Sequence, residues 1–199
     1  MFDPLGIMSP ITVRGKCLVQ EAWREKVDWD TPLDDHYVQE WVNLKQEYLL
    51  TTMVSIPRRF DTDDTYTENQ LHIFCDASAK AYGAVAYCVS KEKCNIIMSK
   101  TRVAPLKKRT LPQLELTAIE VGTRLAKYLV ETLNIFENVY VWTDSEICLH
   151  WIAKNDSAIP YVRNRVNKIL ELRSNYQYNH VSSRDNPADI LSRGSMSQN

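Results

Sequence analysis

Hydrophobic and polar positions divide the chain into two unequal regions. Residues 61–69 form a polar, acidic run that is nearly free of aliphatic side chains and stands between two regions with regular apolar spacing. A run of this kind is typical of a linker. The pattern therefore predicts a small region over residues 1–60, a larger one over residues 70–194 and a tail over residues 195–199.

The small region has the apolar spacing of two amphipathic helices. Apolar side chains recur at intervals of three and four residues over Pro10–Lys26 and again over Leu33–Leu50. These intervals match the period of an α-helix. Because two helices of this size bury little core by themselves, we expect the small region to lean on something else.

The larger region alternates between strand-like and helix-like patterns. Runs rich in β-branched and aromatic residues predict strands, and stretches with helical period predict helices. The predicted strands cover residues 71–75, 83–89, 95–99, 139–143 and 176–181. The predicted helices cover residues 110–133, 145–154, 161–173 and a last short stretch after residue 185. This order, βββαβααβα, predicts an α/β fold with a mixed sheet.

Capping residues mark the starts of two of these helices. Thr110 and Gln113 have the spacing of a capping box, and Pro112 stands in the first turn, where proline is well tolerated. Asp185 or Asn186 is expected to cap the last helix.

Four acidic residues stand where these elements begin or end. Asp76 and Asp144 each follow an apolar strand, and Glu115 and Asp189 lie in the first turns of two helices. Taken singly, each has an ordinary interpretation as a turn, cap or first-turn residue. An unpaired charge directly after an apolar strand is harder to explain in this way. Since active groups in α/β sheets collect at strand ends and nearby helix N-termini, we expect the four carboxylates to form one site.

Four carboxylates in one place predict a divalent-metal site. They repel one another unless cations neutralise them. Oxygen ligands without His or Cys favour Mg²⁺ or Mn²⁺ over zinc. A pair of such ions about 3.5–4 Å apart activates a water molecule and stabilises the leaving oxygen of a phosphodiester. The acids therefore predict a metal-dependent nuclease.

Composition narrows the class of protein. The 199-residue chain is 44% hydrophobic, which is the content of a globular protein rather than a disordered one. No run approaches the roughly 18 apolar residues of a membrane-spanning helix, so no membrane partner is expected. The five cysteines include no C-x-x-C pair, which favours reduced thiols in an intracellular protein, cytoplasmic or nuclear, over a zinc site.

Basic side chains are concentrated in one segment although the net charge is only −1. Within ten residues the chain carries Lys100, Arg102, Lys107, Lys108 and Arg109. By itself, such a run is more often a solvated surface than a binding site. Beside a nuclease site it becomes a candidate contact for a phosphate backbone.

The segments around the four acids resemble ribonuclease H. They are Phe74-Cys75-Asp76-Ala77-Ser78, Leu114-Glu115-Leu116-Thr117-Ala118, Trp142-Thr143-Asp144-Ser145 and Asn186-Pro187-Ala188-Asp189, in the order of that family's four acids. Four motifs in one order are far more specific than any one of them. The resemblance covers about residues 70–194 and implies the ribonuclease H-like fold, a mixed five-stranded sheet with flanking helices.

More narrowly, the chain resembles the ribonuclease H domain of BEL/Pao-type LTR retrotransposon pol polyproteins. Residues 99–107 are similar to that group's segment before the glutamate helix. Residues 2–10, with Trp23 and Asp28-Trp29-Asp30, are similar to the stretch after its reverse-transcriptase palm. The resemblance implies that residues 1–60 are a helical remnant of the reverse-transcriptase thumb or connection region, and that the polymerase domain is a partner.

The resemblance also implies a reaction and a role for each acid. The chain would be an Mg²⁺-dependent endonuclease, a truncated pol product, that cleaves the RNA strand of RNA–DNA hybrids and leaves a 3′-hydroxyl and a 5′-phosphate. Asp76 would bridge two Mg²⁺ ions, or Mn²⁺ in their place. Glu115 and Asp144 would each hold one ion, and Asp189 would complete the second. The residues expected to contact the nucleic acid are Ser78, Lys100, Arg102, Lys107, Lys108, Arg109, Ser145 and Asn186.

Departures from the family leave alternatives open. The sequence has no Tyr-x-Asp-Asp polymerase motif and leaves little room for the Trp-rich basic handle of cellular enzymes, so low hybrid affinity is expected without a polymerase domain. His180 stands roughly where the family often has a histidine, but a strand-end surface residue is the preferred interpretation. The alternative function is a catalytically silent retroelement remnant or a nucleic-acid-binding module. A DDE-type strand-transfer enzyme is disfavoured, because the glutamate comes second.

Overall fold

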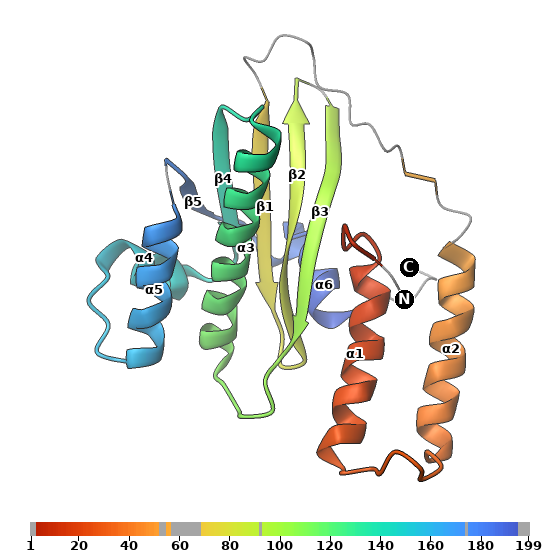
Figure 1. Ribbon diagram of the computed structural model, residues 1–199. Helices are drawn as coiled ribbons and strands as arrows, with labels where there is room; N and C mark the ends of the chain where they lie inside the picture. The colour runs from red at the N-terminus through yellow and green to blue at the C-terminus, as the bar shows by residue number, and fades with distance from the viewer. Residues whose placement is uncertain (1–2, 52–54, 57–68, 92, 174, 195–199) are drawn as a thin grey trace.

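The computed structural model describes residues 3–51, 55–56, 69–91, 93–173 and 175–194. The helices are α1 (Ser9–Arg24), α2 (Asp35–Thr51), α3 (Leu111–Leu133), α4 (Glu146–Lys154), α5 (Pro160–Leu172) and α6 (Asp189–Arg193), and a 3₁₀ turn covers Ser183–Asp185. The strands are β1 (Gln70–Ala77), β2 (Ala81–Ser90), β3 (Lys93–Val103), β4 (Asn138–Thr143) and β5 (Gln177–His180). The predicted element order and the α/β class are confirmed (Figure 1).

The five strands form one mixed sheet in the order β3-β2-β1-β4-β5. The three strands β1, β2 and β3 pair antiparallel, whereas β4 lies parallel to both β1 and β5. The parallel register places Cys75 opposite Thr143. The residues that follow, Asp76 and Asp144, therefore reach the same edge of the sheet, as expected for neighbouring parallel strands.

Helix α3 covers one face of the sheet with most of the core. The odd-numbered side chains of β1, Leu71, Ile73 and Cys75, are fully buried on that face. Their alternation follows from the two-residue repeat of a strand. Gly122 of α3 lets the helix approach this face closely, since a Cβ at that position would lie 2.4 Å from the Cys75 Sγ. As predicted, α3 begins after the N-cap Thr110 with a capping box.

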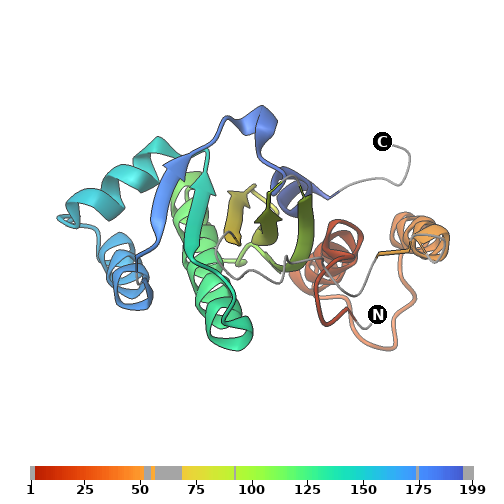
Figure 2. The ribbon, with the colours of Figure 1, turned by 90° about the horizontal axis from the view of Figure 1, so that it is seen from above.

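The short helix α6 packs on the opposite face, where the even-numbered side chains of β1 point (Figure 2). Leu191 and Ala188 of this segment form a small buried cluster with Val85, and Phe74 packs against it. The site acid Asp76 lies on this second face, because it is one residue out of phase with the side chains under α3.

Helix α1 packs along β3 and α6, so the small region leans on the sheet (Figure 2). The Lys16 ammonium donates a hydrogen bond to the backbone oxygen of Thr101 at 3.2 Å, and the Gln20 amide donates one to Ala104 at 2.6 Å. Arg14 of α1 also links that helix to α2, since its guanidinium pairs with Glu40 and Glu47 at 2.9 and 2.5 Å.

The predicted linker falls almost entirely outside the described residues, as does the tail over residues 195–199. Asn69 is the exception: it is buried, and its backbone oxygen accepts a hydrogen bond from the amide of Glu137. Asn69, which directly precedes β1, is thus joined to the residue before β4. Within the described part of the chain, none of the helices is long and apolar enough to cross a membrane.

The predicted cap of the last helix is wrong. The N-cap of α6 is Ala188, which offers no side-chain hydrogen bond, and Asp185 ends the preceding 3₁₀ turn. The Asn186 side chain is buried: its amide donates to the backbone oxygen of Cys75 at 3.0 Å, and its Oδ1 accepts from the amide of Ala188 at 3.1 Å. A cap serves only its own helix, whereas this asparagine ties the helix entrance to β1.

The close approach of α3 predicts that Gly122→Ala destabilises the fold. The new methyl group would overlap Cys75 and lie 3.0 Å from Ile73, and we expect a loss of about 1–3 kcal/mol in the free energy of unfolding. Gly15→Ala in α1 is the matched control: outside its own stretch of helix, no atom of the described residues lies within 4 Å of the new methyl group, so helix propensity should raise stability by about 0.5–1 kcal/mol. Urea unfolding of both variants measures this. Equal stability of Gly122→Ala and the parent would contradict the packing.

Candidate active site

Two strand ends and two helices supply the four predicted acids. Asp76 is the second-last residue of β1 and is only 6% exposed, and Asp144 follows β4 directly and is half-buried. Glu115 is half-buried in the first turns of α3, and Asp189 is the first residue of α6. Each acid therefore lies at the strand end or helix start that the local sequence pattern predicted.

Electrostatic effects show which acids lie close to one another. Burial, together with the negative charges of Asp144 and Asp189 and against the hydrogen bond from Ser192, raises the pKa of Asp76 to about 6. Burial also raises the pKa of Glu115, with a further contribution from Asp144 and an opposing hydrogen bond with Ser145. Asp144 therefore acts on acids of both β1 and α3 and occupies the centre of the group.

The four carboxylates lie near one another, but they do not converge on a single point. Among the described residues, no three His, Cys, Asp or Glu side chains converge closely enough to hold a metal ion. The structure thus gathers the predicted residues at one edge of the sheet, while metal coordination by them stays a prediction.

One oxygen of Asp144 shows that a cation suits this place. Its Oδ2 accepts a hydrogen bond from the Ser183 hydroxyl at 2.6 Å, whereas its Oδ1 is buried and has no partner among the described residues. A buried carboxylate oxygen without a donor is costly. Oxygen donors of this kind are the ligands that Mg²⁺ and Mn²⁺ prefer. The residues present therefore fit a hard divalent cation.

The C-terminal segment orients the strand-end acids with two serines that the sequence analysis missed. The buried Ser192 donates a short hydrogen bond to Asp76 Oδ2, and the exposed Ser183 donates the one to Asp144. Ser192 follows Asp189 by three residues, so helical period alone would have placed both near one face of α6. No comparable spacing signal identifies Ser183.

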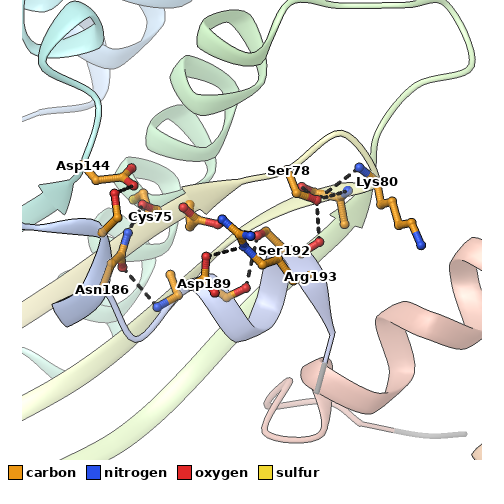
Figure 3. Close-up of polar contacts among 12 residues, drawn as sticks. Cys75, Ser78, Lys80, Asp144, Asn186, Asp189, Ser192 and Arg193 are labelled. Atoms are coloured by element: carbon orange, nitrogen blue, oxygen red, sulfur yellow. Dashed lines mark hydrogen bonds and ion pairs between the residues drawn. The ribbon is translucent and has the colours of Figure 1, made fainter. Parts of the chain in front are cut away.

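Three residues predicted to touch nucleic acid use their polar atoms within the protein. The Ser78 hydroxyl donates to the backbone oxygen of Ser192 at 2.7 Å, and Asn186 bridges β1 and α6 as described (Figure 3). Ser145 is buried and caps α4 by accepting from the amide of Cys148. These side chains hold the site together, and their contact with a substrate stays a prediction.

The predicted basic residues lie on β3 and in the loop before α3. Lys100, Arg102, Lys107 and Lys108 are exposed, whereas Arg109 is half-buried against the ring of Tyr161. His180 is the exposed last residue of β5, opposite Thr143, which agrees with its interpretation as a strand-end surface residue.

A comparison with protein families identifies the family to which this chain belongs. The family model described as the Pao retrotransposon-like RNaseH-like domain matches residues 1–145, which is more than half of the chain. The chain belongs to this family. The match includes Asp76, Glu115 and Asp144, and Asp189 lies beyond it. A search of the curated proteins finds no matching relative.

Solved structures show the same fold for this Pao RNaseH-like domain. The foamy viral protease–reverse transcriptase in complex with double-stranded DNA has a TM-score of 0.52 at 12% identity, covering 83% of this chain and 33% of that one. LC11-RNase H1, isolated from compost and solved with an RNA/DNA hybrid, has a TM-score of 0.50 at 14% identity and covers 65% and 96%. The N-terminal RNase H domain of rv2228c from Mycobacterium tuberculosis has 0.50 at 16%, with 62% and 91% covered.

Family and fold together make the Pao domain a ribonuclease H-type enzyme domain. The sheet order and flanking helices are those predicted from the resemblance. The likeness to solved structures is below 20% identity, so it supports the fold, and the family match connects the fold with retrotransposons.

The raised pKa of Asp76 predicts that Asp76→Asn stabilises the metal-free protein at neutral pH. The ordinary pKa of 3.8 rises to about 6 on folding, so the folded state holds its proton more tightly. The raised pKa of Asp76 stabilises the folded state fully below pH 3.8, and this stabilisation is lost as the pH rises through about 6. At about 1.4 kcal/mol per pKa unit, less the lost serine hydrogen bond, we expect a gain of about 1–2 kcal/mol at pH 7.5 and none at pH 4.

Urea unfolding in EDTA at both pH values measures this effect. Asp185→Asn is the matched control, because Asp185 is an exposed acid whose carboxylate, within the described part of the chain, accepts a hydrogen bond only from Ser182. An Asp76→Asn gain that is the same at pH 4 and pH 7.5 would contradict the assigned cause.

Proposed function

We propose that this domain is an Mg²⁺-dependent endonuclease that cleaves the RNA strand of RNA–DNA hybrids within a retrotransposon pol product. One observation supports it most: Asp144, at the centre of the acids in a domain of the ribonuclease H type, has a buried oxygen with no hydrogen-bond partner among the residues that the structure describes. That oxygen is costly in a silent scaffold and useful in a metal site.

The acids and their serine partners have separate tasks in this reaction. Asp76, Glu115, Asp144 and Asp189 would hold two Mg²⁺ ions, or Mn²⁺, which when bound supply a polarised water and stabilise the leaving oxygen. The Ser192 and Ser183 hydroxyls each fix one oxygen of a strand-end carboxylate. Each such hydrogen bond leaves the second oxygen available and limits rotation of the carboxylate.

Substrate selection rests on the backbone of the hybrid. Exposed basic residues of β3 and the following loop would contact phosphates, which makes binding weaken steeply with salt. The 2′-hydroxyl groups distinguish the RNA strand from DNA. The LC11 enzyme, solved with an RNA/DNA hybrid, has the same fold and makes this substrate the first to test. We expect the reaction inside the cell, as the cysteine pattern predicts.

The experiment is cleavage of an end-labelled RNA–DNA hybrid by the purified chain in Mg²⁺. Asp144→Asn should lower the rate on the order of 10³-fold or more, because it removes a group that acts in the transition state. Asp185→Asn, an exposed acid in the C-terminal segment, should cut like the parent. Double-stranded RNA should stay intact.

Three outcomes separate the candidates. Hybrid-specific cleavage that is lost in Asp144→Asn supports the nuclease. Hybrid binding without cleavage by a folded parent, at any Mg²⁺ or Mn²⁺ concentration, would instead indicate a nucleic-acid-binding module. Neither binding nor cleavage would indicate a silent retroelement remnant.

We also propose that the polymerase domain of the same element contacts α2. Helical period places Val38, Trp41, Val42 and Leu49 on one side of this helix, and all four are exposed. Such an apolar stripe is typical of an interaction surface. The foamy viral neighbour, a protease–reverse transcriptase, supports a polymerase as the partner.

A substitution within this apolar stripe tests whether α2 contacts the polymerase domain. Trp41→Glu should weaken binding of the chain to a separately produced polymerase domain of a Pao-type element by at least about tenfold, as for loss of a buried aromatic anchor. His36→Glu, an exposed residue on the other side of α2 by helical period, should leave binding unchanged. Calorimetric titration measures both, and equal affinities would reject α2 as the contact.

A further inference from the structure

We propose that Arg193 is a resident counter-ion of the four acids: its guanidinium pairs with Asp189 in the metal-free protein and must leave that carboxylate when a divalent cation binds there. The inference rests on the proposed function, because it concerns the ions of that reaction. It gives a task to a residue that the sequence analysis did not select. A counter-ion of this kind sets how tightly the acids bind their ions.

Arg193 lies one helical turn after Asp189 on α6. The Arg193 Nε donates to Asp189 Oδ1 at 2.6 Å, a charge-assisted hydrogen bond at the (i, i+4) spacing of a helix. Figure 3 shows the Arg193 side chain turned back along α6 toward Asp189. The pair therefore occupies one of the two oxygens that Asp189 could offer to a metal ion.

The positive charge of Arg193 also acts on β1. Burial has the largest effect on the pKa of Asp76 and raises it, as do the negative charges of Asp144 and Asp189, whereas the charge of Arg193 lowers it. The guanidinium thus favours the charged forms of acids on two elements, α6 and β1. A bound cation has the same effect on a group of like charges.

The pair between Arg193 and Asp189 is one that a stronger cation can replace. The two side chains are 69% and 37% exposed, so water screens their attraction. A divalent ion carries twice the charge of a guanidinium, and carboxylate oxygens are ligands that Mg²⁺ and Mn²⁺ prefer. Because both cations need the same carboxylate and repel each other, Arg193 must turn away when an ion binds to Asp189.

A cavity beside α6 offers the guanidinium a second place. Its volume is about 390 Å³, it lies between α1, α2 and α6, and the charged residues that line it are Arg14, Glu21, Glu40, Lys80 and Arg193. Glu40 is paired with Arg14 at 2.9 Å. The half-buried Glu21 carboxylate has no hydrogen bond or ion pair with any other described residue. A guanidinium released from its first partner therefore finds another carboxylate in the same cavity.

Titration of the full chain with Mn²⁺ alone, without nucleic acid, tests the counter-ion. Calorimetry measures the affinity of each Mn²⁺ site, and thermal unfolding in EDTA and in saturating Mn²⁺ is the second readout. The variants are Arg193→Gln and Arg193→Lys, with Arg193→Gln also placed in an Asp189→Asn background. Arg184→Gln is the matched control. Arg184 is an exposed arginine of the same C-terminal segment and has no ion pair or side-chain hydrogen bond within the described part of the chain.

The proposal predicts that Arg193→Gln tightens the weaker Mn²⁺ site about two- to fivefold, the range for an exposed ion pair that no longer competes. Arg193→Lys should bind like the parent, since an ammonium at this spacing can also pair with Asp189. Arg184→Gln should have less effect, and Arg193→Gln should have little effect in the Asp189→Asn background, where the contested carboxylate is gone. In EDTA, Arg193→Gln should unfold at a lower temperature than the parent, and saturating Mn²⁺ should remove the difference.

Glu21→Gln tests the second place of the guanidinium. It should weaken the same Mn²⁺ site in the parent, because the displaced Arg193 loses its other partner. It should have no effect in the Arg193→Gln background. Equal effects in both backgrounds would show a distant effect of the lost negative charge and would reject Glu21 as the second partner.

Other results would overturn the counter-ion. Equal tightening by Arg193→Gln and Arg184→Gln would show only a general effect of lost positive charge. Unchanged or weaker Mn²⁺ binding by a folded Arg193→Gln variant would show that Arg193 does not compete with the ion. A parent chain that cleaves the hybrid but lacks the predicted Mn²⁺ pattern would reject the counter-ion alone. The predicted pattern in a parent that cannot cleave would reject the nuclease and leave the counter-ion standing, and a parent that binds no Mn²⁺ would reject both.

Discussion

The parallel pairing of β1 with β4 is the constraint on which the site depends. Because Cys75 stands opposite Thr143, the next residues, Asp76 and Asp144, must share one edge of the sheet. Two like charges placed there oppose folding, and with burial they raise the pKa of Asp76 to about 6. The apolar side chains that precede them under α3 offset this cost, since each fully buried Leu or Ile contributes about 1.5–3 kcal/mol.

The C-terminal segment holds the two strand-end acids in place from the other face of the sheet. It supplies Asp189, and its two serines each donate a hydrogen bond to one strand-end carboxylate. Asn186 joins its entrance to the backbone of β1. A segment with only one short helix has little core of its own, so these polar links, together with the small cluster around Leu191, determine where its acid lies.

The sequence predicted the parts of this protein that depend on local pattern. Strand periodicity, the capping box at Thr110 and the acids after apolar runs all follow from neighbours in the chain, and the structure contains them. Long-range partners escaped prediction. Asparagine is common at helix N-caps, but the Asn186 side chain donates to the backbone of β1 instead. The stack on Tyr161 joins residues 109 and 161, which are 52 positions apart in the sequence. Pairings of this kind are set by tertiary packing, which spacing does not encode.

The same packing explains why the family match includes α1 along with the sheet. Side chains of α1 donate hydrogen bonds to the backbone of β3 and of the residues after it. At its other side, Arg14 lies so close to Gly194 that a Cβ there would meet the arginine Cγ at 2.7 Å, and Gly194 ends α6 with a positive φ that favours glycine. Helix α1 therefore supports the helix that carries Asp189. Helix α1 is therefore packed as part of the same body as the sheet, whereas the apolar stripe of α2 stays exposed.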